Sequence, residues 1–363
     1  MVKKTSLLGL HTEQLQDVAA EMGLPRFAAK QMAQWLYQKH VTHIDDMTNL
    51  SKSARERLKE NYEIGTAEPL QTLISSDGTE KYLFPTDNGH HVETVFIPDG
   101  ERRTLCVSTQ VGCKMNCLFC QTGKQGFQGN LTVTDILRQV IWAHRRYALT
   151  NLVLMGQGEP LDNYDAMMQA LQLITSDEGM GWSPRRITVS TVGLRKTLQR
   201  FLDESPCNLA VSLHSPIHSQ RLQIMPAEKQ FPIADIVTLL AKYFPRNQRL
   251  ETATGADSSH QRRLSFEYIV MHGINDTPAH MKELIRLLRP LNCRVNLIRW
   301  HEIPGVDLQS ADEATMLQLR NWLTQHGVFT TIRASRGQDI FAACGLLSTG
   351  ATSRHCEEDL NHE

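Results

Sequence analysis

The stretch VGCKMNCLFC at residues 111–120 holds three cysteines in the pattern C-x3-C-x2-C, at Cys113, Cys117 and Cys120. A structural zinc site usually takes four ligands, commonly as C-x2-C pairs, and the sequence has no such second pair. Three thiolates on one short loop can instead ligate three irons of a [4Fe–4S] cluster and leave the fourth iron open. An open iron can bind the amino and carboxylate groups of S-adenosylmethionine (SAM). The spacing therefore predicts a cluster of this type as the metal site.

From about residue 104 onward, apolar β-branched runs alternate with amphipathic helical patterns. Such strands, joined by helical crossovers, indicate a parallel sheet. Six units are too few for a closed eightfold barrel, so we expect an α/β fold with a partial (βα)6 barrel, whose functional groups gather at the C-terminal ends of the strands. The predicted strands are 105–109, 152–155, 186–191, 209–213, 264–271, 294–300 and 329–333, and the predicted helices lie near 132–147, 164–176, 194–204, 233–244, 278–290 and 312–326.

Two smaller regions precede this barrel. Residues 1–64 carry amphipathic helical patterns, one of them capped by Ser51, and predict a helical N-terminal domain. Residues 65–100 contain Asp77-Gly78 and Asn88-Gly89, which are typical of hairpin turns. We therefore expect a short β extension there, followed by the barrel at 101–347.

Composition indicates an ordinary soluble protein rather than a strongly basic nucleic-acid binder. The net charge is −1, and the sequence has no apolar run long enough to span a membrane, so we expect a cytoplasmic protein. Eight cysteines without a secretion signal favour metal binding or catalysis over a disulfide framework. The polar segment 247–263 is expected to be a mobile surface loop, and the acidic tail 348–363 to be disordered. Local candidates for RNA phosphate contact are Arg102, Arg103, Lys114, Lys124, Arg185 and Arg186.

The ends of the predicted strands carry small and polar residues that suit a bound SAM. The sequence LMGQGEP at 154–160 supplies Gly158, where the backbone can approach a ligand, and Glu159, which can accept a hydrogen bond from an ammonium group. Further candidates at strand ends are Ser190, Ser212, Leu213, His214 and Asn296. Each of these positions is as well explained by structure alone as by ligand binding.

Two isolated cysteines flank the barrel: Cys106 in its first strand and Cys344 beyond its last one. Taken alone, each is best explained as a small buried apolar residue. In context they complete a set of motifs: VETV (92–95), CVSTQVGC (106–113), MGQGEPL (155–161), SLH (212–214) and ACG (343–345). Together these motifs resemble the RlmN/Cfr family of radical-SAM RNA adenine methyltransferases, over a region from the N-terminal helices to about residue 347.

The resemblance implies a reaction and its partners. Family members methylate an adenosine of 23S rRNA in the peptidyl-transferase centre and consume two SAM molecules. The RlmN branch methylates C2, and also acts on the adenosine next to the tRNA anticodon (position 37). The resemblance further implies an electron donor such as flavodoxin, and a monomer is compatible with everything in the sequence.

The resemblance also assigns roles to single residues. Cys344 would receive a methyl group and carry it as S-methylcysteine. After the carbon has bonded to adenine, Cys106 would attack the Cys344 sulfur and form a transient disulfide that releases the product. Glu93 would accept the proton from the ring carbon. From its sequence context alone, Glu93 is an ordinary carboxylate at a strand edge.

Three alternatives remain beside the C2 reaction. The Cfr branch, which methylates C8 and confers antibiotic resistance, shares all of these cysteines, and C2 is favoured because it is the more widespread activity. An iron–sulfur RNA-binding protein without turnover would have no use for Cys106, Cys344 and Glu93. A radical-SAM enzyme acting on a protein or metabolite is disfavoured by the helical N-terminal region and the paired outlying cysteines.

Overall fold

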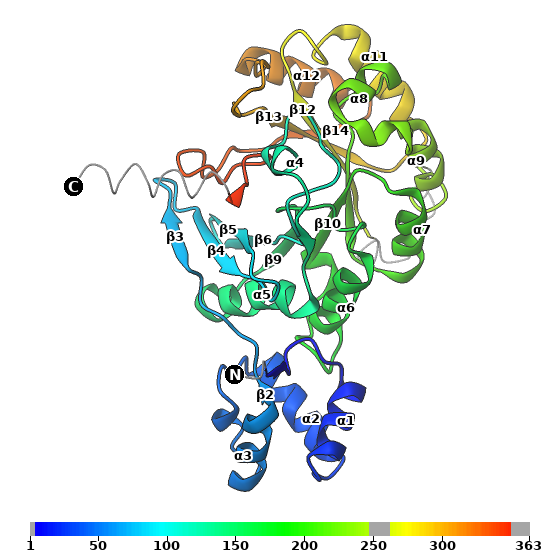
Figure 1. The fold of residues 1–363 in the computed structure, drawn as a ribbon. Helices are drawn as coiled ribbons and strands as arrows, with labels where there is room; N and C mark the ends of the chain where they lie inside the picture. Colours follow the sequence, from blue (N-terminus) through cyan, green and yellow to red (C-terminus); the bar gives the residue numbers. More distant parts are fainter. Residues whose placement is uncertain (1–3, 247–261, 350–363) are drawn as a thin grey trace, which may run out of the picture.

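The computed structural model describes residues 4–246 and 262–349, which form a helical N-terminal unit below a larger α/β body (Figure 1). The hydroxyl of Ser51 accepts a hydrogen bond from the Ala54 amide at 3.2 Å, which confirms the predicted helix cap. The elements of this unit are β1 (Thr5–Ser6), α1 (Thr12–Glu21), α2 (Phe27–Ala33), the π-helical turn η1 (Gln34–Gln38), the 3-10 turn η2 (Ile44–Asp46), α3 (Lys52–Asn61) and β2 (Tyr62–Glu63).

The body is built on a sheet that has ten strands in the described residues, in the order β14-β13-β12-β11-β10-β9-β6-β5-β4-β3. The strands from β14 to β6 in this order all run parallel. Each of them except β14 is followed by a helix, as predicted for a partial (βα)6 barrel. The parallel strands are β6 (Arg102–Cys106), β9 (Asn151–Leu154), β10 (Ile187–Thr191), β11 (Asn208–Ser212), β12 (Leu264–Val270), β13 (Arg294–Arg299) and β14 (Phe329–Ile332).

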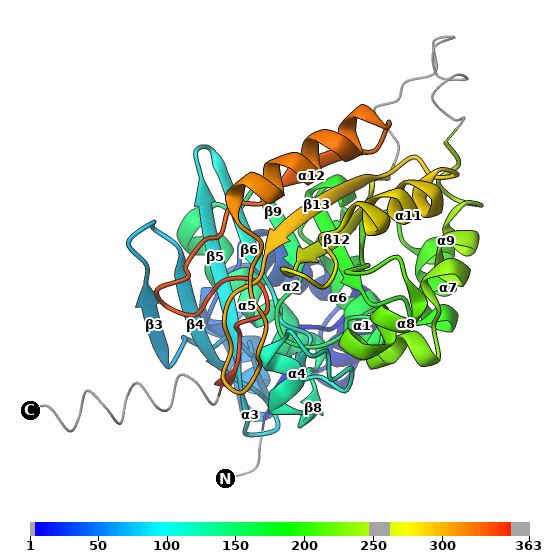
Figure 2. The same cartoon turned by 90° about the horizontal axis from the view of Figure 1, so that it is seen from above.

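Amphipathic helices cover the outer face of the parallel strands (Figures 1 and 2). They bury aliphatic side chains such as Leu137, Leu198 and Leu284 in one continuous core. The connecting elements are β7 (Gln110–Val111), α4 (Gln121–Gln125), β8 (Gly129–Asn130), α5 (Val133–Tyr147), α6 (Tyr164–Thr175), η3 (Pro184–Arg186), α7 (Arg195–Glu204), α8 (His218–Ile224), η4 (Pro226–Lys229), α9 (Ile233–Leu240), α11 (Pro278–Leu288) and α12 (Glu313–Gln325).

The β extension is part of the same sheet. Strands β3 (Gln71–Ile74), β4 (Glu80–Pro85) and β5 (His91–Asp99) form the two predicted hairpins and pair antiparallel. Strand β5 then pairs antiparallel with β6, where Val95 lies opposite Cys106. The sheet therefore continues from the parallel strands into the extension at the strand that carries Cys106.

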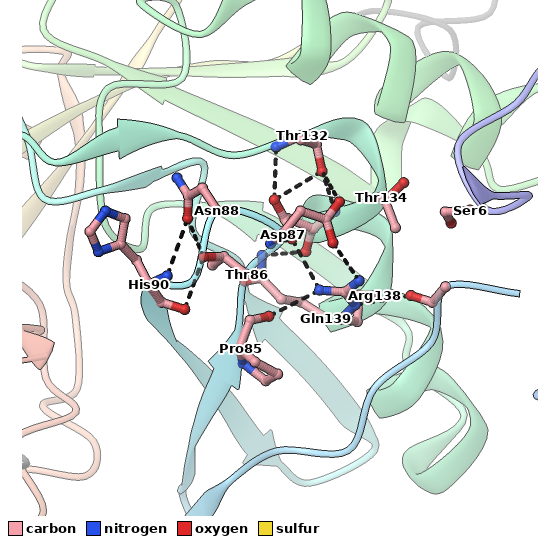
Figure 3. A network of polar contacts seen from close by, with 12 residues as sticks. Ser6, Pro85, Thr86, Asp87, Asn88, His90, Thr132, Thr134, Arg138 and Gln139 are labelled. Carbon is pink, nitrogen blue, oxygen red and sulfur yellow. Dashed lines mark hydrogen bonds and ion pairs between the residues drawn. The ribbon is translucent and has the colours of Figure 1, made fainter. Parts of the chain in front are cut away.

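A buried arginine on α5 connects the N-terminal unit, the β extension and the body (Figure 3). Its guanidinium donates to the carbonyls of Gly65 and Pro85 at 2.9 and 3.0 Å, and forms ion pairs with Asp87 and Asp135. This residue, Arg138, thereby binds the linker that leaves the N-terminal unit and the turn between β4 and β5. Because both carboxylates are held by one guanidinium, removing Arg138 would leave buried charge unpaired.

The predicted domain limits need one correction near the C-terminus. Ser348 was placed in a disordered tail, but it is buried, and its amide donates a hydrogen bond to Glu93 at 2.7 Å. The described body therefore extends to residue 349, because this segment satisfies polar groups of the β extension. The rest of the predicted tail, 350–363, and nearly all of the predicted mobile loop, 247–261, lie outside the described residues. Within the described residues, no helix is long and apolar enough to cross a membrane.

Candidate active site

The cysteine loop, residues 112–120, lies between β7 and α4 at the C-terminal end of the parallel strands. Gly112 has a φ of 71°, and a Cβ atom there would stand 1.6 Å from the carbonyl oxygen of Gly126. Only glycine fits this turn. The Leu118 amide donates to the Ile224 carbonyl of α8 at 2.9 Å, which ties the loop to the helix beside it. The loop is thus held from both sides.

The thiols of Cys113, Cys117 and Cys120 all line one cavity at these strand ends. In the described part of the chain, no three His, Cys, Asp or Glu side chains gather closely enough to hold a single metal ion. Three thiols spread around one cavity suit a cluster in which each sulfur ligates a different iron. Burial raises the pKa of all three thiols, and that of Cys113 to about 12, so they need a metal to stabilise their thiolates. The donor set therefore fits a [4Fe–4S] cluster.

Glu159 lies in the same cavity lining, but its carboxylate is also part of the scaffold. Its two oxygens accept hydrogen bonds from the amides of Leu161 at 3.1 Å and Val192 at 2.9 Å. Burial raises its pKa to about 7, an effect that the hydrogen bonds oppose. A carboxylate has about four acceptor positions, so it retains room for a ligand's ammonium group.

The glycines beside Glu159 are also required by the packing of the chain. We expected Gly158 to let the backbone approach a ligand, but a Cβ there would stand 2.5 Å from the Cβ of Gln110. A Cβ at Gly156 would stand 2.5 Å from the hydroxyl oxygen of Ser108. Both glycines allow their segment to pack closely against Ser108 and Gln110, which lie between β6 and the cysteine loop. Both also line the cavity.

Three predicted strand-end residues reach the cavity: Ser190, Ser212 and His214. The Nδ1 atom of His214 accepts a hydrogen bond from the Ile269 amide at 3.0 Å. Burial lowers the pKa of His214 to about 3, so the ring is neutral and carries its proton on Nε2. Its ring packs edge-on against Phe119 of the cysteine loop, at 4.5 Å between centroids. His214 can therefore offer one N–H donor to a ligand.

Two predicted cofactor residues lie elsewhere. Leu213 is fully buried; its amide donates to the carbonyl of Glu267 and its carbonyl accepts from Arg221. Asn296 lines a separate cavity at the other end of the strands, where its side chain donates to Glu267 and accepts from Thr331. The structure therefore does not bring these two residues to the cysteine cavity.

A buried arginine that the sequence did not reveal supports the SAM-side strand ends. Arg221, on α8, donates to the carbonyls of Ser212 at 2.8 Å, Leu213 at 2.9 Å and Val192 at 3.3 Å. Its charge is neutralised by an ion pair with buried Glu228. Arg221 thereby fixes the ends of β10 and β11, and an arginine in an amphipathic helix gives no sequence signal of that role.

The two outlying cysteines, 238 positions apart in the sequence, come together around one arginine. Cys106 is buried, and this burial is the main reason why its pKa is raised to about 12. The nearby Cys344 thiol raises the pKa further, whereas Arg333 lowers it. Cys344 is exposed and lines the cavity that holds the three cluster cysteines. Both thiols are free here, so a standing disulfide between them is not present. Arg333 also lines this cavity, and nothing in its sequence context marks it as part of the site.

Glu93 lies on the same sheet face as Cys106 but is not part of the cavity lining. It is almost fully buried and forms an ion pair with Lys81 of β4 at 2.9 Å. It also accepts a hydrogen bond from the Ser348 amide. Lys81 in turn donates to the Phe341 carbonyl at 3.4 Å. The Lys81–Glu93 pair therefore binds the C-terminal segment that carries Cys344.

Comparisons with known proteins agree with this geometry. The N-terminal domain family of ribosomal RNA large subunit methyltransferases matches residues 5–64, and the radical SAM superfamily matches residues 107–288. A probable dual-specificity RNA methyltransferase RlmN of Bacteroides thetaiotaomicron is 56% identical, covering 96% of this chain and 97% of that protein. A dual-specificity RNA methyltransferase RlmN of Marinobacter nauticus is 41% identical over 95% of this chain and 93% of its own.

A solved structure is similar over the same extent. The crystal structure of a radical SAM methyltransferase from Sphaerobacter thermophilus superposes with a TM-score of 0.86 at 37% identity, covering 94% of this chain and 98% of that one. A partial βα barrel with three thiols on its first loop defines the radical-SAM enzymes, which use a [4Fe–4S] cluster and SAM. Within that class, this chain belongs to the RlmN family of RNA methyltransferases. The family resemblance found in the sequence is thereby confirmed.

Proposed function

We propose that this enzyme methylates C2 of an adenosine in 23S rRNA and of the adenosine at tRNA position 37, with Cys344 as the methyl carrier. The observation that carries the proposal is that Cys344 lines the cavity of the cluster cysteines and lies close to the buried Cys106. A methyl carrier has to reach both the methyl donor and the acceptor base. Cys344 is exposed and lines two adjoining cavities, which suits such a carrier.

The cofactors have defined places in this proposal. Cys113, Cys117 and Cys120 would hold the [4Fe–4S] cluster, while Gly158, Glu159, Ser190, Ser212 and His214 would surround SAM. The cluster and its bound SAM supply radical chemistry that can activate an unreactive methyl group. Asn296 reaches SAM only if the ligand extends past Glu267 into the second cavity, and Leu213 contributes through packing alone.

The chain's own residues then handle the transferred carbon. Adenine C2 is electron-poor and does not attack a methyl cation equivalent, so the carbon first resides on the Cys344 sulfur. Release requires Cys106 to attack that sulfur, because forming the S–S bond breaks the bond between Cys344 and the carbon. The leaving carbon takes up the proton of the Cys106 thiol and becomes the methyl group of the product, and the one electron that this step releases would pass to the bound cluster. The disulfide is reduced by the electron donor before the next turnover. Glu93 accepts the proton lost from C2. Arg333 favours the thiolate of Cys106, since a nearby cation lowers a thiol's pKa.

The Glu93 role requires a movement. In this structure Glu93 is bound by Lys81 and by the Ser348 amide under the C-terminal segment. For the carboxylate to meet the base, the segment after Cys344 has to leave Glu93.

The experiment that tests the reaction is nucleoside analysis of 23S rRNA and tRNA after incubation with the reduced enzyme and SAM. The proposal expects 2-methyladenosine in both RNAs. Formation of 8-methyladenosine instead would assign the chain to the Cfr-type reaction, and a product in only one RNA would restrict its substrates. A flavodoxin-type electron donor completes the proposal on the support of the family resemblance. A monomeric state and a cytoplasmic location complete it on the support of the sequence, with which both are compatible.

A further inference from the structure

A second cavity opens where the parallel strands begin, at the opposite end from the cysteine loop. Four arginines that line it stand at or next to the first residues of strands: Arg102 starts β6, Arg185 lies in the turn before β10, Arg263 precedes β12 and Arg294 starts β13. Arg333, which follows β14, reaches the same cavity. Because parallel strands begin at a common edge, residues far apart in the sequence are gathered there.

This arginine cavity carries excess positive charge. Glu267 is the only acidic residue among its described lining residues, and it already pairs with Arg333. Within the described ranges, Arg102, Arg263 and Arg294 form no ion pair with a carboxylate. Partial burial and the neighbouring Arg263 both lower the pKa of Arg294. A bound anion would relieve this repulsion between like charges.

Most of the remaining lining is polar and uncharged, with Val153, Met155 and Leu209 as its apolar members, which suits a hydrated, hydroxyl-bearing ligand. Carbonyl, amide and hydroxyl groups can hydrogen-bond to a ribose as well as to phosphate oxygens. The uncharged polar residues that line the arginine cavity are Asn151, Thr188, Asn208, Ser265, Asn296 and Thr331.

The arginine cavity connects with the reacting cysteines. Arg333 and Met155 line both this cavity and the cysteine cavity. Arg333 and Val153 also line a third cavity, whose wall includes Cys344. Val153 lies directly beside Cys106 in the sheet. The arginine cavity therefore adjoins the two cavities that Cys344 lines, and Arg333 belongs to all three.

Two lysines elsewhere on the molecule are already paired with carboxylates. In the N-terminal unit, Lys59 pairs with Asp45 and Glu56. Near the cysteine loop, Lys114 pairs with Asp162 at 2.8 Å. Of the six basic residues predicted to contact phosphate, the structure brings Arg102 and Arg185 together in the arginine cavity.

We propose that the arginine cavity binds the phosphodiester backbone of the RNA on either side of the target adenosine, while the extruded base passes inward to Cys106 and Cys344. The inference rests on the proposed function, because it takes single-stranded RNA as the substrate. Guanidinium groups bind phosphate through paired, charge-assisted hydrogen bonds. A base has to leave its stack to reach a buried reaction centre, and that leaves its two flanking phosphates at the surface.

The test measures RNA affinity of the full-length holoenzyme against salt concentration, by fluorescence anisotropy with a labelled hairpin whose loop contains one unpaired adenosine. In an Arg263→Gln/Arg294→Gln variant, the slope of log affinity against log salt should fall by about 0.7 per arginine removed. Arg320→Gln is the matched control, because this α12 arginine bonds only to Asn321 in the described structure and lies outside the cavity. Its slope should equal that of the unmodified enzyme.

A second arm replaces the two phosphates next to the adenosine by neutral methylphosphonates. The unmodified enzyme and Arg320→Gln should bind this hairpin more weakly, whereas the double variant should show no further loss. Equal sensitivity of all three proteins to the neutral phosphates would overturn the proposal. If thermal unfolding shows that the double variant does not fold, Arg102→Gln, at the exposed start of β6, serves in its place.

The two proposals can fail separately. If the salt slopes fall as expected but nucleoside analysis shows no 2-methyladenosine, the phosphate site stands and the C2 reaction is wrong. If 2-methyladenosine forms while the slopes of all variants equal that of the unmodified enzyme, the RNA backbone binds elsewhere. Inorganic phosphate is added as a competitor of both hairpins and is compared with chloride at equal ionic strength. If phosphate weakens RNA binding no more than chloride does, the RNA backbone is the occupant of the cavity. If phosphate weakens binding more than chloride does, the cavity binds free phosphate.

Discussion

The two ends of the parallel sheet differ in chemistry although the same strands form both. At the C-terminal ends lies a cavity with thiols, small hydroxyls and the neutral His214, bordered by the cysteine loop. At the N-terminal ends lies a cavity with five arginines and one glutamate. Arg333 and Glu267 belong to both. If the arginine cavity binds RNA as proposed, the enzyme separates radical chemistry from substrate binding along the length of its strands.

This division has a physical reason. A radical reaction needs a site that excludes water and bulk solutes, which a loop packed across strand ends provides. Binding a polyanion needs exposed cations and gains from an open, hydrated surface. Substitutions of residues that line only one of the two cavities should therefore leave the function of the other intact.

The largest effect is expected at the cysteine end. In a Cys113→Ala/Cys117→Ala/Cys120→Ala variant, the visible absorbance of the [4Fe–4S] cluster and all methyl transfer should be lost, because no thiolate remains to ligate iron. Affinity for the RNA hairpin should be retained. Cys293→Ala, at a cysteine outside the cavity, should keep the absorbance. An unchanged spectrum in the triple variant would disprove the cluster site.

Next in size is the loss of the methyl carrier. Cys344→Ala should keep the cluster absorbance and RNA binding but abolish methyl transfer, since no other exposed thiol lines the cavity in the described residues. Mass spectrometry of the unmodified enzyme should find a methyl group on the peptide that contains Cys344. A Cys344→Ala variant that still methylates RNA would rule out the carrier.

The third effect concerns release rather than formation of the product. Cys106→Ala should accumulate a covalent complex between protein and RNA, because Cys344 can then bond to the base but nothing attacks its sulfur. Denaturing gels should show this complex with RNA and SAM and not without SAM. Normal turnover in this variant would mean that Cys106 is only a buried structural residue.

The smallest effect is on the pH dependence of the free energy of unfolding that Glu159, in the cysteine cavity, causes. It is measured on metal-free protein. Glu159 has its pKa raised from about 4.5 to about 7, so the folded state binds its proton more tightly than the unfolded state. The free energy of unfolding should therefore fall as pH rises between these values, by on the order of 3 kcal/mol relative to Glu159→Gln. Glu283, whose pKa is lowered by Arg286, is the control. Glu283→Gln should change the pH dependence weakly and with the opposite sign, as denaturant titrations across pH would reveal.

Much of the scaffold could be predicted from local patterns. Two-sided apolar runs and helical periodicity located every parallel strand to within a few residues, because burial on both faces leaves a direct mark on composition. The hairpin turns of the extension and the cap at Ser51 followed from residues with strong local preferences. The spacing of Cys113, Cys117 and Cys120 predicted the cluster loop for the same reason: its ligands are neighbours in the chain.

The sequence by itself thus determined the barrel, the cluster loop and, through resemblance, the family. Only the tertiary structure decided that Lys81 holds Glu93, that Arg221 fixes two strand ends, and that Ser348 belongs to the body. It also separated Asn296 from the SAM side and gathered the arginines at the strand starts. These pairings join residues that are distant in sequence, and a single charged residue in a strand or helix carries no mark of the partner that folding brings to it.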